Sequence, residues 1–178
     1  MNEKFRSCIM EQADMNRALA RIAHEIIERN GNEQAIHLIG VERRGVSLSA
    51  IIADNIERFS DLKVHRASIN IASFRDDAER DLAAPPTDSP ICSVTGETVI
   101  IVDDVIHTGR TARAALEAVL SLGRPAKIQL AVLIDRGHRE LPIRGDYIGK
   151  NVPTSKSELI KVHIPPYDDV VNVELYEK

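Results

Sequence analysis

The sequence contains no tryptophan, and aromatic residues make up only 3% of its 178 residues. The core must therefore be built mainly from aliphatic side chains. Its two cysteines, Cys8 and Cys92, have neither a CxxC motif nor the Cys/His spacing of a metal site, so we expect reduced thiols. No apolar run reaches the length of a membrane span, and the charged first residues are unlike a signal peptide. These absences predict a cytoplasmic protein without membrane contact.

What is present is the composition of an ordinary globular protein, with 43% hydrophobic and 28% charged residues. A chain of this length suits a single domain, residues 1–178, with a substantial core. The formal net charge of -4 argues against a protein that coats nucleic acid through overall positive charge. It leaves room for a local basic patch.

Helical and strand patterns alternate along the chain. Aliphatic residues at helical spacing predict helices over residues 11–30, 46–59 and 111–122. Short runs rich in branched side chains predict strands over residues 35–41, 63–74, 98–102, 127–134, 159–164 and 170–176. This alternation is typical of an α/β fold, and it predicts a mostly parallel twisted sheet flanked by helices.

Two segments show neither pattern. Residues 75–96 are polar, contain prolines and are too long for a routine connection, so we expect a flexible lid loop or a disordered spacer. Residues 135–156 predict an excursion at the carboxyl edge of the sheet. Extended to residue 158, this excursion would form a small hood over the site.

The stretch VIIVDDVIHTGRT, residues 99–111, combines a strand, two carboxylates and a polar turn. Asp103 and Asp104, the acidic pair, would lie at the carboxyl end of a parallel strand, where such sheets bind ligands. The turn at residues 107–111, here called the phosphate turn, offers Gly109, two threonine hydroxyls and the amides of a helix start, which bind phosphate. Carboxylates repel phosphate, so the pair must bind sugar hydroxyls or a cation. A sugar phosphate satisfies both parts, whereas a solvated strand end is the alternative.

This stretch resembles the phosphoribosyl pyrophosphate signature of the type I phosphoribosyltransferases. The resemblance extends to RALARIAHEIIERN, FRDD and DRGHRELPIRGDYIGKNVPTSKSE, which together are similar to the bifunctional pyrimidine operon regulators that are also uracil phosphoribosyltransferases. The last segment, residues 135–158, is the most specific. No GxGxxG motif occurs, and Val46 stands where a Walker loop has its lysine.

The resemblance implies an enzyme that forms UMP and pyrophosphate from uracil and phosphoribosyl pyrophosphate, with Mg²⁺ held through substrate oxygens. It implies that Asp103 binds the ribose hydroxyls, that Asp104 lies near the anomeric carbon, and that Arg75 in the lid contacts pyrophosphate. Preorganised carboxylates would stabilise positive charge on the sugar in the transition state. The other implied contacts are His107, Thr108, Gly109, Arg110 and Thr111 for the 5′-phosphate, Glu42, Arg43, Arg44 and Gly45 for pyrophosphate, and Arg136, Gly137 and His138 for uracil.

The resemblance also implies an RNA-binding regulator that attenuates transcription of pyrimidine genes in response to uridine nucleotides. The implied contacts to an mRNA leader are Arg21, Arg29, His138, Arg144 and Lys150. Residues 135–156 carry five Lys or Arg residues against three acidic ones, a local excess that can bind phosphates. Few aromatic residues are available for base stacking, so phosphate contacts would dominate. Relatives form dimers or larger assemblies, which predicts a homo-oligomer.

Three departures from the family pattern leave alternatives open. Glu42 stands where members often have lysine or glutamine, and Asn70, Ala72 and Ser73 interrupt a predicted strand. Ala20 replaces a threonine that often contacts RNA. One alternative is a nucleotide-sensing RNA-binding regulator with little catalysis. Another is a phosphoribosyltransferase for a different base.

Overall fold

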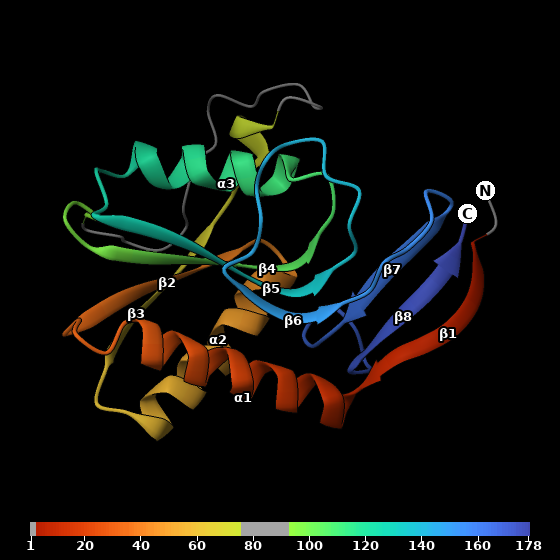
Figure 1. Ribbon diagram of the computed structural model, residues 1–178, viewed down its shortest axis with the longest axis horizontal. Coiled ribbons are helices and arrows are strands. Elements are labelled where there is room, and N and C mark those ends of the chain that lie inside the picture. The colour runs from red at the N-terminus through yellow and green to blue at the C-terminus, as the bar shows by residue number, and fades with distance from the viewer. Residues whose placement is uncertain (1–2, 76–92) are drawn as a thin grey trace.

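The computed structural model describes residues 3–75 and 93–178 (Figure 1). Its larger sheet has five parallel strands in the order β3-β2-β4-β5-β6. The strands are β2 (Ala35–Val41), β3 (Lys63–Ile69), β4 (Thr98–Ile106), β5 (Lys127–Asp135) and β6 (Tyr147–Asn151). The predicted α/β fold with a mostly parallel sheet is confirmed.

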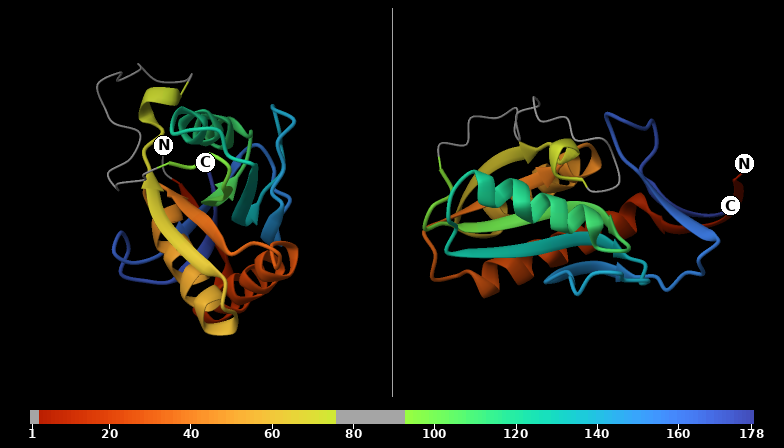
Figure 2. Two further views of the ribbon diagram at one scale, coloured as in Figure 1. Left: turned by 90° about the vertical axis from the view of Figure 1, so that its left-hand side faces the viewer. Right: turned by 90° about the horizontal axis from the view of Figure 1, so that it is seen from above.

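Helices cover both faces of this sheet. α1 (Gln12–Arg29) and α2 (Arg44–Phe59) lie on one face, and α3 (Arg110–Ser121) lies on the other (Figures 1 and 2). Alternation along β4 serves both layers: Ile100 and Val102 join the core with α1 and α2, whereas Val99 and Ile101 join the core with α3. Burial on both faces explains why the central strands β2, β4 and β5 are rich in aliphatic residues.

A smaller antiparallel sheet, in the order β1-β8-β7, lies beyond the carboxyl ends of β4, β5 and β6 (Figures 1 and 2). It consists of β1 (Lys4–Glu11), β7 (Glu158–His163) and β8 (Asn172–Glu177). Because β1 pairs with β8, the first and last strands of the described residues lie side by side in this sheet. The small sheet thus borders the edge of the larger sheet where the acidic pair is expected.

The region expected to be the hood is built differently. Residues 147–151 form β6, the fifth strand of the larger sheet, instead of belonging to an excursion. The separate sheet uses β1, which the sequence did not predict because most of its side chains are exposed and leave no apolar run. Pairing with β8 supplies the strand's hydrogen bonds.

The strand predicted over residues 63–74 is also shorter. β3 ends at Ile69, and a 3₁₀ turn follows at Ala72–Phe74. The Asn70 side chain accepts a hydrogen bond from the Ala72 amide at 2.9 Å, a local turn that competes with strand pairing. The predicted lid falls mostly on residues 76–92, which lie outside the described residues.

Candidate active site

β4 continues through the acidic pair instead of ending before it. β2 pairs with β4 only as far as Gly40 and Val102, whereas β5 pairs with β4 as far as Ile106. The edge of β4 beyond Val102 is therefore open on the side of β2. β2 is followed by α2 and β4 is followed by α3, and these two helices lie on opposite faces of the sheet (Figure 1). Open α/β sheets bind ligands at the point where neighbouring strands lead to helices on opposite faces.

Asp103 is buried and Asp104 is partly buried, and backbone amides hold both carboxylates. An oxygen of Asp103 accepts a hydrogen bond from the Asp104 amide at 2.9 Å, and an oxygen of Asp104 accepts one from the Val105 amide at 2.7 Å. Burial, followed by the charge of Asp104, raises the pKa of Asp103 well above its ordinary value. Burial also raises the pKa of Asp104, against the opposing effect of Arg44. Two carboxylates of this kind are stabilised by hydroxyl donors or a cation.

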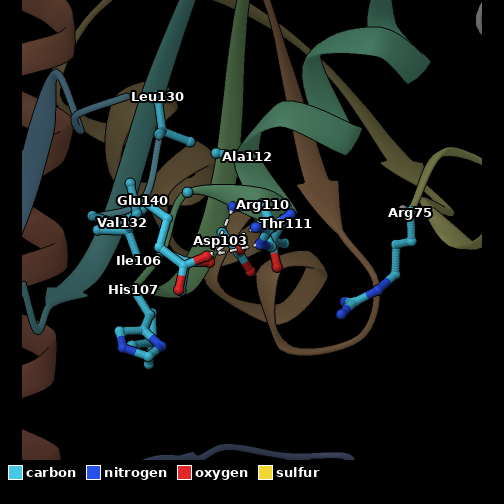
Figure 3. A pocket seen from close by; sticks show the side chains of 13 residues that line it. Arg75, Asp103, Ile106, His107, Arg110, Thr111, Ala112, Leu130, Val132 and Glu140 are labelled. Atoms are coloured by element: carbon cyan, nitrogen blue, oxygen red, sulfur yellow. Dashed lines mark hydrogen bonds and ion pairs between the residues drawn. The ribbon is translucent and has the colours of Figure 1, made fainter. Parts of the chain in front are cut away.

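A cavity of about 410 Å³ opens beside Asp103. All five residues of the phosphate turn line it, together with Asp103 and Arg75 (Figure 3). Arg75 extends toward the cavity from the side opposite β5, and its positive charge acts on the carboxylate of Asp103 (Figure 3). Leu130 and Val132 of β5 add an apolar wall. The cavity therefore combines a carboxylate, cations and an apolar surface.

The phosphate turn starts α3 without a side-chain cap, and the first turn of this helix carries no acidic residue. Gly109 has φ of 94°, in the left-handed region, and an added Cβ would lie 3.4 Å from Leu141 Cβ. The Arg110 amide donates to Thr108 Oγ1 at 3.3 Å, and this helix start lines the cavity, as do helix starts that bind phosphate. Burial, then Arg136 and His138, lower the pKa of His107, so its imidazole is neutral at pH 7.

The loop Glu42–Gly45 joins β2 to α2. A Cβ on Gly45 would lie only 2.4 Å from the Val102 carbonyl oxygen, so glycine lets α2 begin directly against β4. Arg43 is exposed, whereas Arg44 donates two hydrogen bonds to the carboxylate of Asp168, at 3.2 and 3.1 Å. The charge of Arg44 still acts on Asp104. This loop lies next to the acidic pair but outside the lining of the 410 Å³ cavity.

Comparison with known proteins places this geometry in a family. Residues 8–169 match the model of the phosphoribosyl transferase domain. The chain belongs to the phosphoribosyltransferase family. It is 49% identical over 176 residues to the bifunctional protein PyrR of Clostridium kluyveri, covering 98% of this chain and 99% of that one. It is 51% identical over 171 residues to the bifunctional protein PyrR of Clostridium acetobutylicum, covering 95% and 96%.

The fold is shared more widely. The hypoxanthine phosphoribosyltransferase of Trypanosoma cruzi superposes with a TM-score of 0.76 at 18% sequence identity, and the match covers 97% of each chain. This likeness concerns the fold alone. The high identity to the PyrR proteins makes this phosphoribosyltransferase a member of their family as well.

The residues expected at the base lie after β5. Arg136 is 3% exposed and donates to Thr154 Oγ1 at 3.1 Å and to the Glu158 carbonyl oxygen at 2.7 Å, so it fixes the approach to β7. The Gly137 amide donates to Asp135 at 2.9 Å. His138 is exposed, its Nε2 contacts the Thr154 carbonyl, and its ring lies 6.1 Å from that of His107. Gly137 and His138 therefore border the phosphate turn, while the guanidinium of Arg136 is directed toward residues 154–158.

Two residues of this site were not predicted from the sequence. Arg139 donates to the carbonyl oxygens of His107 and Ile143, each at 2.8 Å, and pairs with Asp135. Glu140 lines the cavity and pairs with Arg110 at 2.9 Å. The spacing of Arg139 gives no local signal, because its partners in the phosphate turn are about thirty residues away. Its place in the DRGHRE segment was the only available indication.

Three of the five expected RNA contacts meet where α1 packs beside β6. Arg21 donates to the carbonyl oxygens of Ile148 and Gly149, at 3.0 and 2.6 Å. Arg29 pairs with Asp146 at 3.1 Å, and its guanidinium lies 5.7 Å from the centre of the Tyr147 ring. Contacts with β6 and with Asp146, the residue before it, therefore fix the positions of both arginines.

Lys150 completes this group. Its Nζ donates to the Ile9 carbonyl oxygen at 3.1 Å, and it lines a shallow cavity of about 350 Å³ with Arg17 and Arg21. The other two expected contacts lie elsewhere: Arg144 lines a different cavity, and His138 lies near the phosphate turn. Within residues 3–75 and 93–178, no helix is long and apolar enough to span a membrane.

Proposed function

We propose that this phosphoribosyltransferase forms UMP and pyrophosphate from uracil and phosphoribosyl pyrophosphate. The observation that carries the proposal is that Asp103 and the uncapped phosphate turn line one cavity. A carboxylate accepts hydrogen bonds from the hydroxyls of a ribose, and the amides at a helix start donate hydrogen bonds to its 5′-phosphate. The high identity to proteins named bifunctional supports a second, regulatory activity in the same chain.

The reaction forms a bond between uracil N1 and the anomeric carbon and breaks the bond between that carbon and the pyrophosphate oxygen. Uracil N1 gives up its proton, and pyrophosphate leaves with the bonding electrons. Positive charge develops on the sugar in between, and the carboxylates of Asp103 and Asp104 stabilise it. Arg75 and the loop Glu42–Gly45 offset the negative charge of the leaving group.

The residues of the candidate site fit a Mg²⁺ ion that binds mainly through oxygens of the substrate. Among the described residues no cluster of three or more His, Cys, Asp or Glu side chains could hold a metal. Asp103 and Asp104 have pKa values raised by burial, so a nearby cation would favour their charged forms. Mg²⁺ commonly binds through substrate phosphates and water, and it would neutralise charge on the pyrophosphate. Asp103 and Asp104 are the residues that would face it.

Uracil is proposed to bind between the apolar wall of β5 and residues 136–138. Leu130 and Val132 offer the flat apolar contact. The amides of Arg136 and Gly137 already donate to Ile106 and Asp135, so the carbonyl oxygens of residues 136–138, each with two lone pairs, are the groups that would accept from the base edge. The choice of uracil over other bases rests on the family, because no side chain near Gly137 specifies it. A phosphoribosyltransferase for another base is therefore the second candidate.

The regulatory activity is proposed to be binding of an mRNA leader under the control of uridine nucleotides. Arg21, Arg29 and Lys150 form a basic group beside β6, and contacts to β6 and β1 hold them in place. Such a group binds RNA phosphates while the rest of the chain stays negative. A transcriptional regulator acts where RNA is made, so we place the protein in the cytoplasm. From the family resemblance we also propose that it is a homo-oligomer.

The decisive assay offers each of the four common nucleobases in turn, with phosphoribosyl pyrophosphate and Mg²⁺. We expect nucleotide to form with uracil, as UMP, and not with the other three bases. Product from another base would replace uracil in this proposal. No product from any base, together with tight binding of UMP and leader RNA, would favour the regulator with little catalysis.

A further inference from the structure

Asp168, in the connection between β7 and β8, binds the residue that starts α2. Its carboxylate accepts hydrogen bonds from Nε and Nη2 of Arg44, at 3.2 and 3.1 Å, and from the Ile164 amide at 3.1 Å. His163 Nδ1 lies 3.1 Å from the same carboxylate. The Asp168 side chain is 15% exposed and that of Arg44 is 35% exposed. A two-pronged pair held by further partners is more rigid than an exposed ion pair.

A second contact ties the same connection to α2. Ser47, in the first turn of the helix, donates from its hydroxyl to the Pro165 carbonyl oxygen at 2.8 Å. Glu174 of β8 extends the network, because its carboxylate lies 3.3 Å from Nε2 of His163. The small sheet and the start of α2, which are more than a hundred residues apart in sequence, are thus joined by these side chains.

Arg44 lies between this network and the acidic pair. Its charge lowers the pKa of Asp104, against the burial that raises it. On the other side, Gly45 packs so closely on β4 that a Cβ would meet the Val102 carbonyl oxygen at 2.4 Å. The start of α2 is therefore fixed by β4 on one side and by Asp168 on the other.

We propose that Asp168 is a positioning residue for pyrophosphate: by holding Arg44, it keeps the loop Glu42–Gly45 in the shape that receives the leaving group. The inference rests on the proposed function, since it concerns one subsite of that reaction. Asp168 acts through Arg44 and does not itself contact the substrate. The Arg44 guanidinium is directed toward Asp168, and the Glu42 amide donates to the Ile69 carbonyl oxygen at 3.1 Å, so the exposed Arg43 side chain is the group of this loop that would meet pyrophosphate.

The test replaces Asp168→Asn in the full chain. Calorimetry measures the Kd of pyrophosphate with Mg²⁺ and the Kd of UMP, and steady-state kinetics measure kcat and the KM for phosphoribosyl pyrophosphate. Loss of a charged hydrogen-bond partner should raise the pyrophosphate Kd and this KM about tenfold. The Kd of UMP, which carries no pyrophosphate, should not change. Asp169→Asn removes the same charge from an exposed neighbour and should match the wild type.

A double variant separates positioning from a general structural role. If Asp168 acts through Arg44, then Arg44→Met combined with Asp168→Asn binds pyrophosphate no more weakly than Arg44→Met alone. The inference is overturned if Asp168→Asn binds pyrophosphate as the wild type does, if it weakens UMP and pyrophosphate equally, or if the two substitutions add.

The same data keep the two proposals apart. A wild type that makes no UMP, with pyrophosphate binding selectively weakened in Asp168→Asn, would end the proposed function and leave the role of Asp168 standing. A wild type that makes UMP, with unchanged KM and pyrophosphate Kd in Asp168→Asn, would do the reverse. A wild type that does not bind pyrophosphate would overturn the inference.

Discussion

The guanidinium of Arg139 donates a hydrogen bond to the carbonyl oxygen of His107 at 2.8 Å. Arg139 also donates to the Ile143 carbonyl oxygen and pairs with Asp135 at the end of β5. One side chain thus joins the phosphate turn to the segment proposed to contact the base. Its planar, five-donor shape makes this possible, and lysine could satisfy only part of the set.

Arg139→Lys is therefore expected to weaken UMP binding. The variant keeps the charge but loses the fork that connects His107 with Ile143, so the Kd of UMP should rise by about tenfold in calorimetry. Arg124→Lys, an exposed substitution beyond the amino end of β5, is the matched control. An unchanged Kd for UMP in Arg139→Lys would show that the phosphate turn holds its shape without this side chain.

Asp104→Asn is expected to reduce turnover more than substrate affinity. The substitution keeps the shape of the side chain but removes the charge that stabilises the sugar in the transition state, so kcat should fall by about a hundredfold or more. Steady-state kinetics with uracil measure this against Asp61→Asn, an exposed carboxylate that precedes β3. A rise in KM with unchanged kcat would mean that Asp104 only binds the ground state.

Removal of Asp168 should have a pH-dependent effect on stability. Burial alone would raise the pKa of Asp168, but hydrogen bonds from Arg44, His163 and the Ile164 amide outweigh it and lower the pKa from 3.8 to about 2. A lowered carboxyl pKa contributes stability above the ordinary value, and this is lost as the pH falls through the folded value; here the contribution is roughly 2 kcal/mol at pH 7.

Urea unfolding of the wild type and Asp168→Asn measures this difference. The gap in unfolding free energy should be largest at pH 7 and should shrink between about pH 4 and pH 2. A gap of constant size across this range would mean that the charge of Asp168 contributes nothing.

The basic group near β6 predicts a salt-dependent interaction with RNA. Arg29→Ala combined with Lys150→Ala should weaken binding of a pyrimidine leader RNA and flatten its salt dependence, by about one logarithmic unit of slope for each RNA phosphate that is no longer neutralised. UMP synthesis should persist. The control removes two equivalent charges, Arg124→Ala with Lys127→Ala, near the amino end of β5. If RNA binding and UMP synthesis fall together in the first variant, the patch is structural.

The central strands of the larger sheet were predictable because they are buried on both faces. The predicted bounds of β2, residues 35–41, match the structure, because a short run rich in branched aliphatic residues and bounded by polar residues favours a buried strand. β6 was missed because its sequence YIGKN has only two apolar residues, and pairing with β5 and packing on α1 create the strand. β4 was predicted too short, because two aspartates disfavour a strand that pairing with β5 nonetheless extends.

In the candidate site, too, the residues that are close in sequence were predictable and those that are far apart were not. The phosphate turn and the acidic pair are consecutive in sequence, so one stretch of residues indicated both a helix start and a carboxylate pair. Arg139 and Asp168 act on residues about thirty and more than a hundred positions away, and no local spacing marks them. Arg44 was expected at pyrophosphate from the family resemblance, and only the folded chain reveals its pairing with Asp168.

A crystal structure of the protein grown with UMP tests the central claim most directly. We expect the 5′-phosphate within hydrogen-bond distance of the amides at residues 108–111, with ribose hydroxyls on the carboxylates of Asp103 and Asp104. A nucleotide bound away from the 410 Å³ cavity, or one with its phosphate against β6 and its ribose free of both carboxylates, would contradict it.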